Sequence, residues 1–502
     1  RALLLDARRP VVLLPRRAAG RIALADAVAP ECPDLGVMLA YTPLHRLLFG
    51  LPGDEPGPRV LVMTSGNVAG EPIVTDDADA MRRLDGLADA WLQHDREIQV
   101  PCDDSVVRVA DGAQLPVRRS RGYAPLPIAL PVEVDAALAV GGDVKNTFCV
   151  ADGRYAWLSA HIGDMDDLAT LQAFERATGH LATLCGVAPD TLVADRHPAY
   201  RSSRWARRNA DGREVRLVQH HHAHVASAMA ENGHDGSAPV IGIAFDGTGY
   251  GDDGAVWGGE VLVADYDGYD RAAHLRYAWL PGGDAGVRNP CRMALSHLRA
   301  ADLAWDPALP CVRACTPEER SILARQLDRG FGCVPTSSMG RLFDAMSSLA
   351  GVCHRIAYEA EAAMRFEGLA RPALDRCGAG YAFDIRTPDR QPWQADPAPV
   401  VRAAARDVRA GVAAEIVAAR FHLAVADLVV DLARRLRDAR GLDTVALSGG
   451  VFLNAVLTEL ACRRLEAAGF RVLRHRLVPP SDAGLALGQV VVGARAARKT
   501  QQ

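Results

Sequence analysis

Short apolar runs separated by turn-forming residues dominate the first 130 residues. Apolar segments open the chain at 2–5 and 11–14, and β-like runs bounded by Gly, Asp, Asn or Pro follow at 60–63, 106–109 and 116–117. This alternation is typical of strands joined by turns. A proline-rich stretch at 125–131 predicts a linker that closes this first domain.

A strand, a Gly-rich acidic turn and a second strand occur twice in the rest of the chain. The first unit has apolar runs at 137–140, 147–150 and 155–158, with turns at 141–143 and 152–153. The second has runs at 240–245, 255–257 and 261–264, with turns at 246–249 and 252–254. The repetition predicts a duplicated α/β architecture with a cleft between its halves.

A third Gly turn, at 448–450, follows an apolar strand at 444–447 and precedes a helical pattern that starts near Asn454. A strand, a glycine turn and a helix N-terminus together form the usual phosphate cradle of α/β proteins. Three such turns in one duplicated region predict nucleotide binding.

Four histidines lie within the five residues 220–224, at the start of an apolar-patterned helix that runs to about Ala230. His220 and His224 are one helical turn apart and project from one face, which suits a divalent transition metal. Position 221 is not Glu, so the zincin metalloprotease motif is absent.

Asp246 and Asp482 are the candidates for the remaining metal ligands, since each lies beside a Gly-containing turn. The alternative role of Asp482 is to cap a helix that begins near Ala483. Two imidazoles and two carboxylates form a mixed N/O ligand set that suits iron or zinc and leaves room for a phosphate oxygen.

The composition is that of a globular protein and excludes a disordered or fibrous chain. The 502 residues have 49% hydrophobic and 24% charged side chains with a net charge of −4, and about three domains are expected at roughly 100–200 residues each. No apolar run is long enough to span a membrane, and the weak negative charge makes nucleic acid an unfavoured partner. The charged N-terminal residues are not typical of a signal peptide, so we expect a cytoplasmic protein.

The cysteines and lysines further limit which kinds of site the sequence can form. The eleven cysteines include no CxxC pair, which argues against a disulfide framework or a four-cysteine zinc site. Lys145 and Lys499 are the only lysines among 57 basic residues. The compact ammonium of Lys145 can approach a phosphate where a guanidinium is too bulky.

Together these motifs resemble the HypF family, the carbamoyltransferases of [NiFe]-hydrogenase maturation. The sequences that carry the resemblance are GGDVKNTF at 141–148, QHHHAH at 219–224, FDGTGYG at 245–251, LPGGD at 280–284, SSMGRLFD at 337–344, SGGVFLN at 448–454 and SDAGLALG at 481–488. In the first domain, TSGN at 64–67, DDSVVR at 103–108 and RSRGYAP at 119–125 resemble the later part of a YrdC-like domain. The resemblance covers essentially the whole chain.

The resemblance implies an α/β fold in which a partial YrdC-like domain precedes a duplicated, actin/sugar-kinase-like (RNase-H-like) domain of two lobes. We expect the C-terminal portion of the YrdC-like domain at 1–130, TsaD-like lobe I at 131–238, and lobe II at 239–502 with its C-terminal segment returning to lobe I. Family members carry an acylphosphatase domain and zinc fingers upstream. Neither occurs in this sequence, so we expect a chain that begins inside its first domain.

The resemblance also implies an activity. Carbamate from carbamoyl phosphate is activated by ATP as carbamoyl adenylate in the YrdC-like domain, and the TsaD-like domain transfers the carbamoyl group to the C-terminal Cys of a HypE-type acceptor protein. The implied cofactors are ATP and one divalent metal, iron or zinc, with Mg²⁺ as a further candidate.

Site residues follow from the same resemblance. Carbamate or adenylate binding is expected at Ser65, Asn67, Arg108, Arg119 and Arg121. The metal ligands are His220, His224, Asp246 and Asp482, and both histidines count as catalytic together with Lys145, which neutralises phosphate. The expected nucleotide-lining residues are Gly247, Thr248, Gly340, Gly449, Gly450 and Asn454, with Asp344 on the ribose.

Three other functions remain open. Small-molecule O-carbamoyltransferases contain similar domains, but in them the TsaD-like domain precedes the YrdC-like domain, which is the reverse of the order expected here. A tRNA threonylcarbamoylation enzyme requires tRNA binding, which the near-neutral charge disfavours. An actin-like ATP-binding regulator explains the Gly turns but not the histidine cluster with Asp482, and a metal-free protein would favour it.

Overall fold

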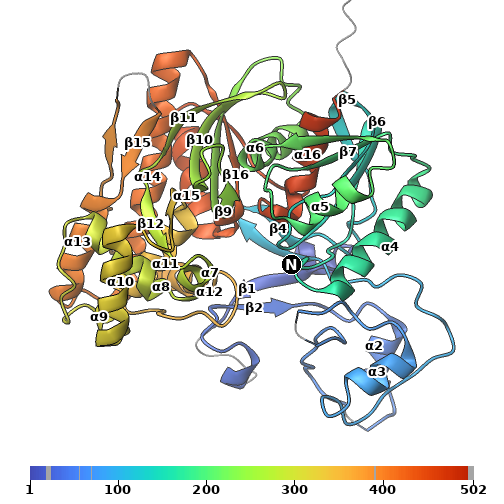
Figure 1. Cartoon of the computed structure of the whole chain (residues 1–502). Helices are drawn as coiled ribbons and strands as arrows, with labels where there is room; N and C mark the ends of the chain where they lie inside the picture. Colours follow the sequence, from blue (N-terminus) through green and yellow to red (C-terminus); the bar gives the residue numbers. More distant parts are fainter. Residues whose placement is uncertain (18–23, 56, 69, 389–391, 496–502) are drawn as a thin grey trace, which may run out of the picture.

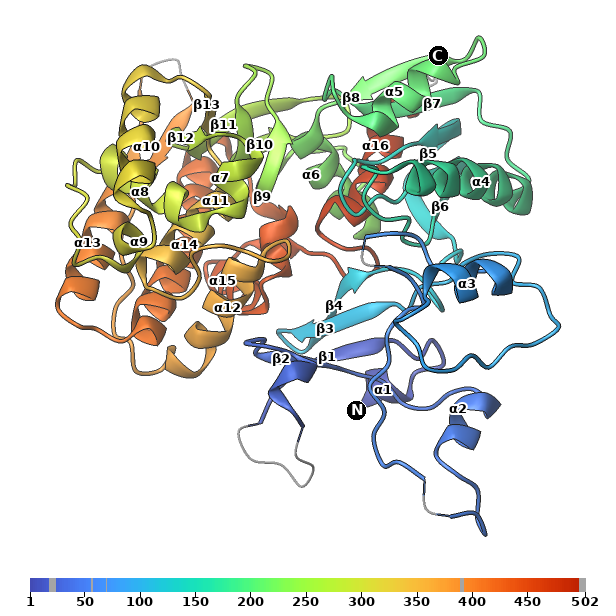
Figure 2. The same cartoon turned by 60° about the horizontal axis from the view of Figure 1, so that its bottom comes forward.

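The residues that the structure describes form three β-sheets, each built from a different part of the chain (Figures 1 and 2). The computed structural model describes residues 1–17, 24–55, 57–68, 70–388 and 392–495, so Lys499 lies outside the described residues. Two four-stranded sheets come from the first half of the chain, and a nine-stranded sheet comes from the second.

The first sheet has the strand order β2-β1-β3-β4. Its strands are β1 (Val11–Pro15), β2 (Asp34–Val37), β3 (Val106–Ala110) and β4 (Ala113–Arg118), and the helical segments are α1 (Ala2–Leu5), η1 (Asp26–Val28), α2 (Pro43–Leu48) and α3 (Asp77–Arg83). The strands predicted at 106–109 and 116–117 are confirmed. The strand predicted at 60–63 is wrong: no described strand pairs with this segment, and Val62 is 72% exposed.

The second sheet has the order β6-β5-β7-β8. Its strands are β5 (Ile128–Ala139), β6 (Cys149–Leu158), β7 (Thr191–Asp195) and β8 (Glu214–Val218), and its helices are α4 (Leu168–Cys185), α5 (Arg201–Arg208) and α6 (His220–Glu231). The predicted linker at 125–131 already contains the start of β5. The predicted turn at 152–153 lies inside β6, where Gly153 pairs with Val134 at an irregular point of the ladder.

The large sheet has the main order β14-β15-β11-β10-β9-β16-β17. Its strands are β9 (Val240–Tyr250), β10 (Val256–Ala264), β11 (Tyr269–Leu275), β12 (Ala278–Pro281), β13 (Cys333–Thr336), β14 (Asp384–Arg386), β15 (Trp393–Asp396), β16 (Thr444–Ser448) and β17 (Arg471–Leu473). Strand β9 lies between β10 and β16, antiparallel to the first and parallel to the second.

The turn predicted at 246–249 is a bulge inside β9. Phe245 pairs with Gly259 and Gly249 pairs with Trp257, so residues 246–248 lie opposite Gly258 alone. Extra residues in one strand bend it and redirect its side chains, which is a common feature of functional sites. The glycines that suggested a turn therefore permit a bulge in a continuous strand.

Helices cover the large sheet and fill the space between the sheets. They are α7 (Asp284–Arg288), α8 (Pro290–Ala300), α9 (Pro310–Arg313), α10 (Pro317–Arg329), α11 (Met339–Leu349), α12 (Glu361–Ala370), η2 (Arg371–Ala373), α13 (Ala398–Arg409), α14 (Ala414–Arg440), η3 (Gly450–Leu453), α15 (Ala455–Ala467), η4 (Asp482–Gly484) and α16 (Leu485–Gly493). Among the described residues, no helix combines the length and the apolar character needed to cross a bilayer.

Helices α6 and α16 pack together between the second sheet and the large sheet (Figure 1). Gly488 permits their close approach, because a Cβ at this position would lie 1.8 Å from the carbonyl oxygen of Ala223. Apolar residues of both sheets and both helices form one continuous core. This packing fixes the first turn of α6, which carries the clustered histidines, relative to the ends of β9 and β16.

Candidate metal and nucleotide site

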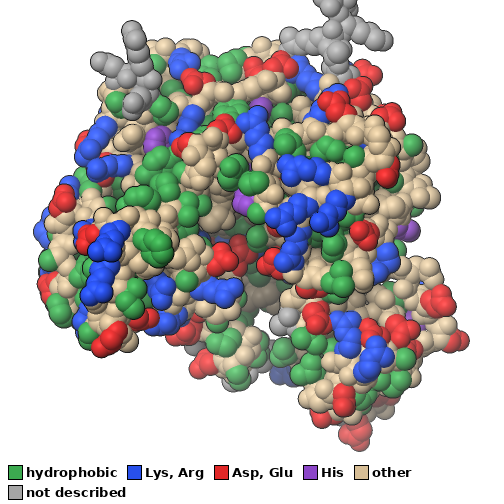
Figure 3. All heavy atoms as spheres, in the orientation of Figure 1, with side chains coloured by type: hydrophobic (Ala, Val, Ile, Leu, Met, Phe, Trp, Pro, Cys, Tyr) green, Lys and Arg blue, Asp and Glu red, His purple; other side chains and the backbone are tan. Residues whose placement is uncertain are grey.

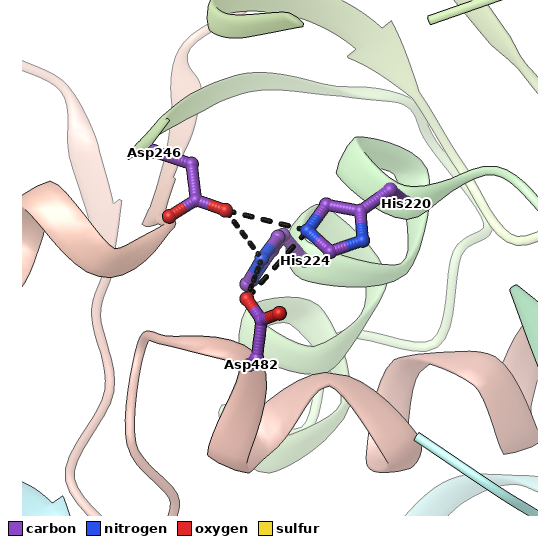
Figure 4. Close-up of side chains that lie close together, drawn as sticks. All are labelled: His220, His224, Asp246 and Asp482. Atoms are coloured by element: carbon purple, nitrogen blue, oxygen red, sulfur yellow. Dashed lines mark hydrogen bonds and ion pairs between the residues drawn. The ribbon is translucent and has the colours of Figure 1, made fainter. Parts of the chain in front are cut away.

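The structure brings together the four side chains that the sequence analysis selected as metal ligands (Figure 4). One ligand atom from each of His220, His224, Asp246 and Asp482 lies within 4.8 Å of the others. The Nε2 atoms of both histidines are 3.3 Å from Oδ2 of Asp246, and they are 3.6 and 3.5 Å from Oδ1 of Asp482. All four residues are buried.

Each of these side chains is positioned by a different local feature. The histidines lie one turn apart at the start of α6, where the side chain of Gln219 caps the helix by accepting from the backbone N–H of His222. Asp246 projects from the bulge of β9. Asp482 is the first residue of the η4 turn that leads into α16. The alternative that it caps this helix is wrong, because the cap positions of η4 and α16 are Ser481 and Gly484 and neither helix has a side-chain cap.

Hydrogen bonds from surrounding groups orient the ligand atoms. The Nδ1 atom of His220 is 2.8 Å from Oδ2 of Asp195, at the end of β7. The backbone N–H groups of Gly247 and Gly450 donate to Oδ1 of Asp246, which leaves its Oδ2 facing the imidazoles. Because the free ring nitrogen of each metal-binding histidine normally has such a partner, these contacts are those expected around a metal.

On the other histidine, Nδ1 of His224 lies 3.5 Å from Oγ of Ser448, which in turn lies 2.8 Å from Nε2 of His475. The site thus contains three residues that were not predicted: Ser448, His475 and Asp195. The sequence did contain a signal for Asp195, because this residue ends a buried apolar strand, and Asp246 was selected for its place after a similar apolar run. His475 offered no such signal because only the fold brings it to α6.

Electrostatics agree with a cation site. Burial alone would lower the pKa of His220, but Asp482 and Asp195 outweigh it and raise this pKa well above the usual value. Burial opposes the charge of Asp246, yet the neighbouring imidazoles of His220 and His224 hold its pKa well below the ordinary range. The two buried carboxylates therefore require positive charge beside them, and a divalent cation between neutral imidazoles supplies it.

Two glycines pack closely against the carboxylates of this group. A Cβ at Gly142 would lie 3.0 Å from Oδ2 of Asp482, and a Cβ at Gly450 would lie 2.8 Å from Oδ1 of Asp246. The Nε2 atom of His224 is buried and lies at ion-pair distance from both carboxylates, without a hydrogen-bond partner among the described residues. An N/O donor set of this kind suits iron or zinc.

Most of the predicted nucleotide residues adjoin the bulge that carries Asp246. Gly449, at φ +95°, would place a Cβ 2.2 Å from the carbonyl oxygen of Phe245, so only glycine fits there. A Cβ at Gly340 would lie 2.8 Å from Cα of Gly247, which brings the start of α11 against β9. Thr248 is exposed beside them.

Asn454 lies at the end of the same glycine loop and caps α15. Its Oδ1 accepts from the backbone N–H of Leu457, and its Nδ2 is 2.8 Å from Nε2 of His422. The helix predicted from near Asn454 is thus confirmed as α15. The side chain of Asn454 orders the loop through these two contacts.

Lys145 and Asp344 have unusual electrostatic surroundings. The Nζ of Lys145 is 2.7 Å from Oε2 of Glu359; burial disfavours its charge, but Glu359 outweighs burial and raises the pKa, with contributions from Asp482 and Asp246. Burial raises the pKa of Asp344 to about 6 although Arg341 is 3.0 Å away. Both predicted residues therefore interact with charged groups that lie between residues 246 and 482 of the chain.

The first-domain residues do not gather in a common binding pocket. Ser65 is exposed, and the side-chain amide of Asn67 donates to the carbonyls of Val68 and Glu71 in its own loop. Their predicted role in binding carbamate or adenylate has no support from these contacts.

The three arginines of the first domain bind protein groups in this structure, and their role in binding carbamate or adenylate stays a prediction. Arg108 pairs with Glu367 and Asp34. Arg119 donates to two backbone carbonyls, and burial lowers its pKa to about 10. Arg121 pairs with Asp104 and its guanidinium lies 4.0 Å from the ring centre of Tyr41. A buried guanidinium needs several acceptors, and the buried Arg108 and Arg119 both find them within the protein.

The face shown in Figure 3 is hollowed between the two halves of the molecule, with acidic and histidine side chains at the margin of the hollow. The second sheet with α5 lies on one side, and the large sheet with its helices lies on the other (Figure 1). The predicted cleft between duplicated halves is thus visible on the surface.

Comparisons with known proteins agree over most of the chain. A family model described as "HypF Kae1-like domain" matches residues 133–231, one described as "Carbamoyltransferase, Kae1-like Domain, second subdomain" matches 242–489, and one described as "Telomere recombination" matches 2–120. A carbamoyltransferase HypF2 of Cupriavidus necator is 41% identical over 98% of this chain and 64% of its own length. A shorter carbamoyltransferase HypF homolog of the same organism is 36% identical over 73% of this chain and 94% of its own length.

A crystal structure of full-length HypF in a phosphate- and nucleotide-bound form has a TM-score of 0.90 at 39% identity, covering 98% of this chain and 75% of that one. These matches confirm the predicted α/β fold class. The chain spans 62–64% of the length of the full-size curated relatives it matches.

Proposed function

Because the chain belongs to the HypF family of carbamoyltransferases, we propose that it takes part in ATP-dependent carbamoyl transfer. The carbamoyl group of carbamoyl adenylate passes to the thiol of the C-terminal Cys of a HypE-type acceptor protein. Carbamoyl phosphate is the source of the carbamate that ATP activates. The observation that carries the proposal is the buried group of His220, His224, Asp246 and Asp482 beside a glycine-lined loop.

The transfer step forms a carbon–sulfur bond. The acceptor thiol loses its proton, its sulfur attacks the carbamoyl carbon, and the bond from this carbon to the adenylate oxygen breaks so that AMP leaves with the electron pair. Carbamate itself is a poor electrophile, and the mixed anhydride provides the good leaving group. A buried site protects this labile intermediate from water.

The metal site serves the phosphate end of the intermediate in this proposal. One iron or zinc ion would be held by His220, His224, Asp246 and Asp482, and it would polarise a phosphate or carbamoyl oxygen when bound. Asp195 holds the ring of His220 through Nδ1, and the N–H groups of Gly247 and Gly450 hold Asp246. These contacts keep the ligand atoms in place during turnover.

Nucleotide binding is assigned to the surfaces next to the bulge of β9. Gly247, Thr248 and Gly340 line one side, while Gly449, Gly450 and Asn454 line the other. Lys145 would exchange the carboxylate of Glu359 for phosphate, and Asp344 would face the ribose. Nucleotide binding as such is supported by the relative that was crystallised with phosphate and nucleotide.

Intact-mass spectrometry of the acceptor tests the proposal. The protein is incubated with ATP and an acceptor that ends in Cys, and carbamate is supplied either from carbamoyl phosphate or directly from ammonium bicarbonate. We expect a mass gain of one carbamoyl group, which is lost when the terminal Cys is changed to Ser. No gain on a folded acceptor, with either source of carbamate, rejects this acceptor in favour of small-molecule hydroxyls or tRNA.

A further inference from the structure

A buried network of charged side chains joins the first sheet to helix α12. In this network Arg108 of β3 makes a bidentate pair with Glu367, with Nη2–Oε1 and Nη1–Oε2 distances of 2.7 and 3.0 Å. Asp34 of β2 accepts from Arg108 at 3.0 Å and from Arg371 at 2.8 Å. Arg108 and Glu367 are only 8% and 4% exposed.

The same ion pair holds the backbone on both sides of Asn454. The Nη1 group of Arg108 donates to the carbonyl oxygen of Leu453 at 2.9 Å. The backbone N–H of Ala455 donates to Oε1 of Glu367 at 3.0 Å. In Figure 2, β3 lies next to α12 and α15, and β3 and α15 are in contact.

These contacts satisfy groups that the helix cannot satisfy itself. The first N–H groups of an α-helix have no partner within the helix, and a carboxylate at this end is favoured by the helix dipole. Glu367 therefore anchors the first turn of α15, and Arg108 fixes the position of Glu367. Asn454, which ends the glycine loop at 449–454, lies directly between the two anchored groups.

We propose that Arg108 and Glu367 are positioning residues for this loop, so that the first domain holds the nucleotide-binding loop of the TsaD-like domain in its working position. The inference rests on the proposed nucleotide site. In this proposal the first domain positions the loop for the carbamoyl-transfer step, in addition to forming carbamoyl adenylate. Arg108, expected from the sequence to bind carbamate, instead couples the two domains.

A second arginine provides a matched control for domain contact alone. Arg474 follows β17 and donates to the backbone carbonyls of Ala110 and Asp111, at 3.2 and 3.3 Å. It thus joins the same sheet to the C-terminal part of the chain. Among the described residues, none of its hydrogen bonds or ion pairs involves 449–455, so Arg474→Met weakens domain contact without releasing the loop.

Hydrogen exchange measured by mass spectrometry on the whole chain tests the proposal. We expect Arg108→Met to speed exchange of the amides at 455–457 about tenfold, as for the loss of one charge-assisted hydrogen bond. Arg474→Met should leave them unchanged. Arg108→Lys retains a buried cation but cannot form the bidentate pair, so we expect the same faster exchange of these amides in this variant.

The nucleotide arm uses a non-hydrolysable ATP analogue. We expect the analogue to slow exchange at 449–457 in the wild type and in Arg474→Met, and to do so only at about tenfold higher concentration in Arg108→Lys. Equal changes in the Arg108 and Arg474 variants, or no change in either, would overturn the inference. Absence of any analogue effect in the wild type would instead refute the proposed nucleotide site, while exchange at 455–457 still reports on the anchor.

Discussion

Replacing Asp195 by Asn tests whether the four-residue group binds a metal. Asp195 does not belong to the group, but its Oδ2 lies 2.8 Å from Nδ1 of His220 and its Oδ1 accepts the backbone N–H of His197 at 2.8 Å. An Asn side chain has only one carbonyl oxygen, so its NH₂ group must face one of these two donors. We therefore expect a less fixed orientation and a lower basicity of the His220 imidazole.

The size of the effect follows from these contacts. Loss of an outer partner of a metal-binding histidine usually lowers metal affinity by about 10–100-fold, or about 1.4–2.8 kcal/mol. Asn retains one acceptor, so we expect about tenfold for Asp195→Asn. Asp195→Ala retains none and should approach the upper end of this range.

Competition with a chromophoric chelator measures the Kd for Zn²⁺, and thermal unfolding confirms that each variant is folded. Asp396→Asn is the matched control. Asp396 is equally buried, and it also accepts a backbone N–H with one oxygen, from Ala398, and guanidinium groups with the other, from Arg276 and Arg386. It has no contact with the histidines, so its loss should lower stability but not zinc affinity.

Two results would refute the reasoning. Unchanged zinc affinity in a folded Asp195→Asn protein would mean that His220 is not a ligand held by this carboxylate. An equal loss of affinity in Asp396→Asn would mean that the effect reports general destabilisation.

Three further predictions concern the same site. Gly249→Ala would place a Cβ 2.5 Å from Cε1 of His221 and 2.7 Å from Cδ2 of His220, so we expect weaker zinc binding in chelator competition. The control is Gly268→Ala, which should bind zinc normally because Gly268 has open space around it. His220→Ala should reduce both carbamoyl transfer and the amount of bound metal measured by elemental analysis, and full metal occupancy would remove His220 from the ligand set. The control is His180→Ala, at an exposed position. Asp344 has a pKa raised from 3.8 to about 6, so the folded state binds a proton that the unfolded state has lost, and the free energy of unfolding should fall by up to about 3 kcal/mol as the pH rises through this window. Asp344→Asn removes this fall, and urea unfolding of both proteins at pH 4.5 and 7.5 checks it; identical pH dependence would contradict the raised pKa.

The sequence alone determined the local chemistry of the site. The spacing of His220 and His224 places both rings on one helical face wherever the helix lies, because helical geometry is local. Asp246 was identified from its place directly after a buried apolar run, although it lies at a bulge inside β9 and not at the end of the strand. The α15 start at Asn454 was also predictable, because a capping residue acts on its own helix.

Tertiary structure decided everything that depends on which distant groups meet. Asp195, Ser448 and His475 complete the site from separate parts of the chain, and no local pattern connects them to α6. The glycines at 246–249 have the composition of a turn, and only the pairing of β9 with β10 makes them a bulge.

Arg108 shows the same limit most clearly. The resemblance to the HypF family implied that it binds carbamate or adenylate, but its partners Glu367 and Leu453 lie more than 250 residues away. The sequence specifies that a guanidinium needs acceptors, and the packing of the domains specifies which acceptors it finds. Buried charges are paired by long-range contacts, and these are the interactions that a local reading of the sequence does not contain.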